Sequence, residues 1–332
     1  METPARYNRD VDLNIARLQP ASAGRGSSMR LDLVTVPYRY DERGEGLGAG
    51  PDALLAAGLP ELLHAAGITF TGPHEAHLDP ALQEEGRTAL NIGRLGADTA
   101  RLIATARRNG DGALVLAGDD TAAIGVVSGL EQAAGAGAAI GVVWVDAHGD
   151  FNTPETSFSG ILAGMPVAIL AGLAGPLWRD AAGLATPVAT GNILLAGVRE
   201  LDEKEEELIR TTDVQVVPAN ELCDGDDFAQ AVDRLARRCA LLYLHVDLDV
   251  LDPRFVPSAS TPSANGLSVD ELVEAMAKVL QTDKVAAVAI SSLNPGAGTR
   301  GERSVASAMK TIAGALPAWI ATPGASAPDS AT

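Results

Sequence analysis

Three side chains that can bind a metal ion stand at every second position of the segment VVWVDAHGDFNTP, as Asp146, His148 and Asp150. In extended backbone this spacing projects all three to one side, about 6.6 Å apart per step of two residues. Polar residues that close an apolar strand in this way have no use in packing, and carboxylates combined with an imidazole suit a divalent cation. The pattern favours a metal site over a structural role.

A second acidic group lies in YLHVDLDVLDP, where Asp247 and Asp249 share a face with His245. Asp252 precedes a proline and indicates a turn. If the two groups converge, at least four carboxylates meet, and such a cluster would repel itself without cations. Two divalent cations would neutralise it, so the combined pattern favours a binuclear metal centre.

A third acidic pair, Asp119 and Asp120, follows the apolar run of ALVLAGDDTAAIG. Aspartate after a strand is a good cap for the helix that comes next, here predicted over 120–134. Adjacent carboxylates at a buried strand end are costly, however, which also suits a ligand position. The residues alone leave both interpretations open.

The composition limits the classes of protein to consider. The chain has 332 residues, 46% of them hydrophobic, which is enough for one large α/β domain. A net charge of −18 argues against nucleic acid or an anionic membrane as a partner and is compatible with bound cations. Cys223 and Cys239 form neither a metal-ligand spacing nor a disulfide framework. With no apolar stretch of membrane-spanning length and no signal-peptide pattern, we expect a soluble cytoplasmic protein.

Short apolar runs alternate with longer alanine-rich segments of helical pattern. Runs such as AAIGVVWV are typical of strands buried on both faces of a parallel sheet, where ligands gather beyond the carboxyl ends. The predicted strands span 31–36, 113–117, 139–146, 192–196, 213–217, 241–247 and 284–290. The predicted helices span 52–66, 95–108, 120–134, 160–172, 202–211, 227–238, 268–281 and 302–315. We expect one domain over 29–320, with an N-terminal extension at 1–28 and a disordered tail at 321–332.

Three motifs follow one another along the chain: A-G-D-D at 117–120, D-A-H-G-D at 146–150 and H-V-D-L-D-V-L-D-P at 245–253. They resemble the G-G-D-H, D-A-H-x-D and S-x-D-x-D-x-x-D-P motifs of the ureohydrolase superfamily, which holds arginase, agmatinase and formiminoglutamase. The segment GLGAGPDALLAAGL at 46–59 also resembles that family, and the likeness extends over 30–315. It implies an arginase-like three-layer α/β/α fold around a parallel sheet of about eight strands. It further implies two Mn²⁺ ions or another hard divalent cation, a small-molecule substrate, and a homotrimer or homohexamer.

Carried over by position, the resemblance implies two sets of metal ligands that share Asp146 and Asp247. One set adds Asp120 and Asp150, and the other adds His148 and Asp249. Asp249 and Asp150 would be catalytic, with Asp249 accepting a proton from the attacking water and passing it to the leaving amine. Asp119 would have a structural role or would contact the metal ligands without binding a metal ion itself. His245 stands where the family has a hydroxyl residue, and it is either a hydrogen-bond donor to a ligand carboxylate, a replacement nitrogen ligand, or a core histidine.

The substrate side departs from the family. Its histidine ligand is Asp120 here, its guanidinium-binding glutamate is Ser292, and a further histidine is Ala163. Serine cannot supply the bidentate charged pairing that a guanidinium prefers, so we expect a C–N bond in an amidine, amide or ureido compound other than arginine. The matching substrate positions are Asn152, Ser159, Asp202 and Glu205. The alternative is a catalytically silent relative that acts as a subunit or regulator of an active enzyme.

Overall fold

The computed structural model describes residues 30–222, 226–296 and 298–319. The predicted extension at 1–28, the predicted tail at 321–332 and Cys223 lie outside the described residues.

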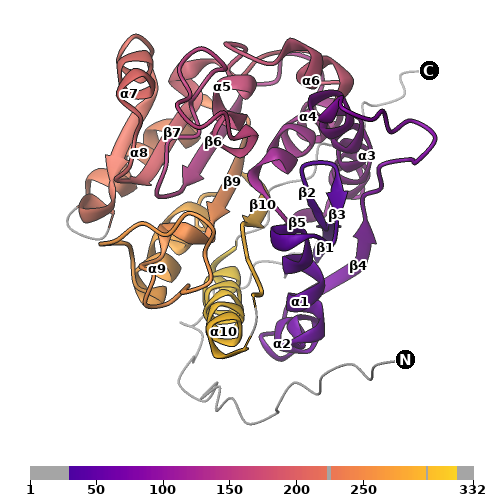
Figure 1. Ribbon diagram of the computed structural model, residues 1–332. Coiled ribbons are helices and arrows are strands. Elements are labelled where there is room, and N and C mark those ends of the chain that lie inside the picture. The colour runs from indigo at the N-terminus through magenta and orange to yellow at the C-terminus, as the bar shows by residue number, and fades with distance from the viewer. Residues whose placement is uncertain (1–29, 223–225, 297, 320–332) are drawn as a thin grey trace, which may run out of the picture.

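An eight-stranded sheet forms the centre of the molecule, in the order β4-β1-β5-β10-β9-β6-β7-β8 (Figure 1). Every neighbouring pair in it is parallel. The central strands are buried along their whole length, which explains their continuous apolar sequences. The strands are β1 (Arg30–Val36), β4 (Thr69–Glu75), β5 (Gly112–Ala117), β6 (Ile140–Val145), β7 (Ile193–Val198), β8 (Gln215–Pro218), β9 (Leu241–Asp247) and β10 (Val285–Ser291).

Helices cover both faces of the sheet, so the expected three-layer α/β/α architecture is confirmed (Figure 1). One hydrophobic cluster packs the sheet against α1 (Gly50–Ala56), α2 (Leu59–Ala65), α8 (Asp227–Arg238), α9 (Val269–Leu280) and α10 (Gly298–Ala315). The other packs it against α3 (Thr88–Arg108), α4 (Ala123–Ala134), α5 (Pro166–Leu170), α6 (Pro176–Ala181) and α7 (Glu203–Arg210).

Each predicted strand is present, with ends within two residues of the predicted ones. The prediction missed β4, an edge strand of sequence TFTGPHE that is largely exposed. It has no apolar run and contains a glycine and a proline, which are signals of a turn rather than a strand. A small antiparallel pair, β2 (Tyr38–Arg39) and β3 (Glu42–Arg43), was also missed because two-residue strands leave no pattern.

The predicted helices were less accurate at their ends. The helix expected over 52–66 is divided at Gly58, whose φ of +89° precedes a new helix start. The helix expected over 160–172 exists as α5 alone, because Pro166 begins it and the 3₁₀ turn η4 (Leu162–Gly164) stands before it. The stretch expected to start at Asp120 opens with the 3₁₀ turn η3 (Asp120–Ala122) before α4. The short helix α6 was missed.

Four adjacent strands, β5, β10, β9 and β6, end at one edge of the sheet, where the acidic motifs follow β5, β9 and β6. The N-terminal glycine segment packs against the same edge. A Cβ at Gly118 would collide with the carbonyl oxygen of Tyr38, and one at Gly50 would collide with the carbonyl oxygen of Leu293. Glycine therefore allows the backbone of residues 38–50 to approach the strand ends closely.

Candidate metal centre

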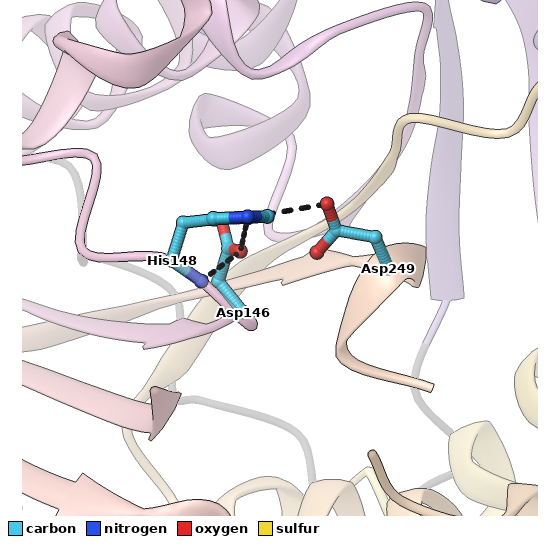
Figure 2. A group of neighbouring side chains, drawn as sticks. All are labelled: Asp146, His148 and Asp249. Carbon is cyan, nitrogen blue, oxygen red and sulfur yellow. Dashed lines mark hydrogen bonds and ion pairs between the residues drawn. The ribbon is translucent and has the colours of Figure 1, made fainter. Parts of the chain in front are cut away.

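Asp146, His148 and Asp249 form a compact group at the ends of β6 and β9, as Figure 2 shows. Nδ1 of His148 lies 3.3 Å from Oδ1 of Asp146 and 3.2 Å from Oδ2 of Asp249. The backbone N–H of His148 also donates to Oδ1 of Asp146 at 2.8 Å. Both carboxylates are buried, whereas the imidazole keeps 27% of its surface exposed. The three side chains could hold one cation at a position that a small molecule can reach.

A second group brings together Asp120, Asp146 and Asp247 from the ends of β5, β6 and β9. One carboxylate oxygen from each lies within 4.8 Å of the others, and all three residues are buried. Asp247 is oriented by the backbone N–H of Asp249, which donates to its Oδ1 at 2.6 Å. Because Asp146 belongs to both groups, two neighbouring cations could share it.

Asp150 belongs to neither group, but it faces the same cluster. Its Oδ2 is buried and has no hydrogen-bond partner among the described residues. The prediction that extended backbone projects Asp146, His148 and Asp150 together is wrong, since β6 ends at Val145 and the next residues bend. Asp150 itself has a φ of +47°, an uncommon conformation for a residue with a side chain. A buried carboxylate oxygen without a donor fits a metal ligand.

The pKa values of the buried carboxyl groups show that a bound cation would stabilise their charged forms. Burial, followed by repulsion from Asp249, raises the pKa of Asp146 to about 7. Burial and neighbouring carboxylates raise the pKa values of Asp150 and Asp247 well above their usual range. Burial opposes the charged form of His148, but Asp146 and Asp249 outweigh it and raise its pKa to about 12. The buried carboxylate oxygens outnumber the imidazole nitrogens of the cluster, and hard divalent cations prefer such oxygen-rich donor sets.

Asp119 and Asp120 have different surroundings. Asp119 accepts the backbone N–H of Thr121 at 3.0 Å and that of Tyr40 at 2.8 Å, so it caps the turn η3 and ties it to the N-terminal segment. Burial raises the pKa of Asp119 to about 6. Asp120 turns toward β9 and β10, where its Oδ1 lies 2.9 Å from Nε2 of His245 and accepts from Ser291 Oγ at 2.7 Å. Ser292 Oγ donates to Oδ2 of Asp120 at 3.1 Å.

Three of the predicted substrate residues meet beside the cluster, and one does not. Nδ2 of Asn152 donates to Oδ2 of Asp202 at 3.2 Å. Glu205 is buried, and its carboxylate accepts the backbone N–H groups of Phe151 at 2.8 Å and of Asp202 at 3.2 Å. Ser159 is exposed, and its Oγ accepts the N–H of Ile161. Glu205 therefore holds the loop that carries Asn152.

Several contacting residues were not singled out from the sequence. Trp144 donates its indole N–H to Oδ2 of Asp146 at 3.0 Å, and Thr261 donates its hydroxyl to Oδ2 of Asp249 at 2.6 Å. Trp144 stands two positions before Asp146, so the alternation of β6 could have identified it. No local pattern marks Thr261. The guanidinium of Arg199 donates to the carbonyl oxygens of Asp249 and Ser263 and so holds the segment that carries Thr261 next to Asp249.

A cavity of about 390 Å³ lies beside this centre, lined by residues 198–200, 218–220 and 263–265. Glu200 belongs to the cavity wall and also approaches the metal centre, because its Oε2 lies 3.8 Å from Nε2 of His148. Asn220 and Asn265 supply uncharged polar groups to the wall. The volume is typical of a small-molecule pocket.

The helices of the described residues include none that is both long and apolar enough to cross a membrane.

Comparisons with known proteins assign the chain to a family. The family model of the arginase family matches residues 30–316. The arginase of Bacillus caldovelox is 30% identical over 275 residues, which cover 80% of this chain and 91% of that protein. The crystal structure of Entamoeba histolytica arginase with L-ornithine superposes with a TM-score of 0.78 at 23% identity, over 87% of this chain and 99% of the other. Formimidoylglutamase from Bacillus subtilis has the same fold, with a TM-score of 0.65 at 16% identity over 92% and 97% of the two chains.

Proposed function

Because the chain belongs to the arginase family, we propose that it is a hydrolase with two divalent metal ions that cleaves a C–N bond of a small molecule other than arginine. The observation that carries the proposal is the pair of ligand groups that share Asp146. A single structural cation would need only one of them. The orphaned Oδ2 of Asp150 supports the same conclusion, because it leaves a further oxygen for a cation.

The two cations would be Mn²⁺ or another hard divalent ion. One would take Asp120, Asp146, Asp150 and Asp247, and the other would take Asp146, His148, Asp247 and Asp249. When bound, they would neutralise the buried carboxylates and activate a water molecule for attack on the substrate carbon.

Asp249 is the group that we assign to proton transfer. Its Oδ2 lies 3.2 Å from His148 and accepts the hydroxyl of Thr261, so the carboxylate is held at the exposed side of the cluster. From there it can accept a proton from the attacking water and return it to the leaving nitrogen. Asp150, whose buried Oδ2 has no hydrogen-bond partner among the described residues, would direct that oxygen to the cation.

The substrate side favours a compound without a guanidinium group. Ser292 directs its hydroxyl to Asp120 and has no carboxylate to offer, and Ala163 has no polar side chain. A guanidinium would find no bidentate partner at position 292. The cavity beside His148, with Asn220 and Asn265 in its wall, would take the part of the substrate that does not react.

The second candidate is a catalytically silent relative that serves as a subunit or regulator. Ser292 and Ala163 favour it, because both lack the groups that the family uses for recognition and proton transfer. Retention of a complete set of buried carboxylates favours the enzyme, since an unused cluster would only cost stability.

The deciding experiment measures metal per chain by elemental analysis of protein from Mn-supplemented cells, followed by chromatographic detection of substrate loss and of the released urea, ammonia, formamide or amine from a substrate panel. The panel contains arginine, agmatine, formimidoylglutamate, and neutral amides and ureides. We expect two equivalents of metal and turnover of an amidine, amide or ureido compound but not of arginine. Turnover of arginine would overturn the substrate proposal, and metal-free protein without activity would favour the silent relative.

A further inference from the structure

Two aromatic rings stack directly beneath the acidic cluster. Trp144 of β6 and His245 of β9 are register partners, their ring centroids lie 3.5 Å apart, and their planes differ by 8°. Both residues are buried, with exposed fractions of 0% and 1%. Trp144 precedes Asp146, the first residue after β6, by two positions, and His245 precedes Asp247, the last residue of β9, by two positions, so the rings form the layer below the carboxylates.

Each ring makes one hydrogen bond with a carboxylate of the same ligand group. Nε1 of Trp144 donates to Oδ2 of Asp146 at 3.0 Å, and Nε2 of His245 lies 2.9 Å from Oδ1 of Asp120. Asp120 and Asp146 belong to the group that also contains Asp247. The stacked pair therefore contacts two carboxylates that come from different strands.

The hydrogen bonds define the tautomer of His245. Nδ1 lies 2.8 Å from the hydroxyl of Tyr243, and Nε2 lies 2.9 Å from Oδ1 of Asp120 and 3.1 Å from Ser291 Oγ, whose hydrogen is directed to the same Oδ1 at 2.7 Å. We therefore assign the imidazole hydrogen to Nε2, with the Tyr243 hydroxyl as donor to Nδ1. With a partner at each nitrogen and Trp144 against its face, the ring has one orientation.

Asp120 consequently has unequal oxygens. Oδ1 accepts from His245 and from Ser291 Oγ at 2.7 Å and lies 3.3 Å from the Ser292 hydroxyl, whereas Oδ2 has only the Ser292 hydroxyl, at 3.1 Å. A carboxylate oxygen with two donors has little capacity left for a cation. Oδ2 is the oxygen that remains for one.

We propose that Trp144 and His245 are positioning residues, a stacked pair that orients Asp146 and Asp120 so that Asp120 binds one cation through Oδ2 alone. The inference rests on the proposed function, because it requires the group Asp120, Asp146 and Asp247 to hold a metal ion. It assigns a role to two buried side chains that contact neither substrate nor cation. Oriented ligands lose less freedom on binding, so the pair should strengthen that one position selectively.

The test is Mn²⁺ titration of metal-free protein by calorimetry, with electron paramagnetic resonance of the loaded protein as a second measurement. Trp144→Phe and His245→Phe keep an aromatic stack but remove one donor each, and His245→Gln keeps a donor near the position of Nε2. Trp178→Phe is the matched control, because Trp178 is also buried but its indole nitrogen has no partner among the described residues. Melting curves of every metal-free variant verify that it folds.

We expect two Mn²⁺ equivalents in the unsubstituted protein and in Trp178→Phe, with the paramagnetic signal of a coupled pair. Trp144→Phe and His245→Phe should weaken one equivalent at least tenfold and lose the coupled signal, whereas His245→Gln should recover most of the affinity. Equal losses in His245→Phe and His245→Gln, or unchanged affinities in all variants, would overturn the inference. Failure of the unsubstituted protein to bind two equivalents would instead overturn the proposed function.

Discussion

The hydroxyl of Ser292 lies 3.1 Å from Oδ2 of Asp120, across 172 residues of sequence. Ser292 has a φ of +61°, so its side chain leaves the end of β10 at an unusual angle and points into the acidic cluster. Ser292 therefore presents a neutral donor to Asp120, whereas the glutamate that the family motif has at this position would present a second carboxylate. Serine at this position therefore lowers the charge repulsion that the metal-free site must tolerate.

Ser292→Glu should destabilise the metal-free protein relative to Ser292→Gln. Both side chains have the same length and the same backbone cost, but only glutamate adds a negative charge beside Asp120. At an effective dielectric constant of about 20, two charges this close repel by a few kcal/mol. We expect the melting temperature at pH 7.5 with chelator to be roughly 5 °C lower for the glutamate variant. Equal melting temperatures would show that position 292 does not face the cluster.

Metal removal should make stability depend strongly on pH. Asp146, with a pKa of about 7, and Asp150 and Asp247, whose pKa values are raised well above their usual range, keep protons in the folded protein that the unfolded chain loses near pH 4. His148, with a pKa of about 12, acts in the same direction above pH 6.5. The folded state binds more protons, so its free energy of unfolding falls as pH rises from about 4 to 8.

Melting temperatures at pH 5, 6, 7 and 8 check this expectation, with chelator and with Mn²⁺. The chelated protein should become less stable at each step, and Mn²⁺ should restore stability most at pH 8, because the cation replaces the protons. A chelated protein that is more stable at pH 8 than at pH 5 would contradict the cluster described here.

Asp247→Asn should reduce the metal content from two ions per chain to at most one. Asp247 contributes to the group with Asp120 and Asp146 and is assigned to both cations, and an amide is a weaker ligand for a hard cation. Asp252→Asn is the matched control, since Asp252 is on the same segment but its Oδ1 accepts from Arg254 at 2.7 Å. Elemental analysis after dialysis distinguishes the two, and equal losses would mean that the substitutions act through folding.

Glu205→Gln should loosen the substrate loop without removing metal. The Glu205 carboxylate accepts the N–H of Phe151 at 2.8 Å, and a hydrogen bond to a buried charged group contributes about 1.5–3 kcal/mol. Hydrogen exchange of the Phe151 amide should accelerate by roughly tenfold to a hundredfold, and KM should rise while the metal content stays the same. Glu206→Gln removes only a surface ion pair with Arg210 and should change neither. Unchanged exchange at Phe151 would show that the loop is held elsewhere.

The strands and the acidic motifs were predictable because both follow from local chemistry. A strand buried on two faces needs a continuous apolar run, and hard cations favour carboxylate ligands, so β5, β6 and β9 and the aspartates that close them are visible in the sequence. The edge strand β4 was not predictable in this way, because exposure allows it a polar sequence.

Only the tertiary structure decided which groups meet around those aspartates. The chain inserts β10 between β5 and β9, which places Ser291 and Ser292 against Asp120. The pairing of β6 with β9 stacks Trp144 on His245, and a buried Glu205 holds a loop although its sequence resembles a solvated helix start. Strand order and register result from packing among distant segments, and no local spacing encodes them. The sequence by itself determined the ligand types, and the sheet order determined their partners.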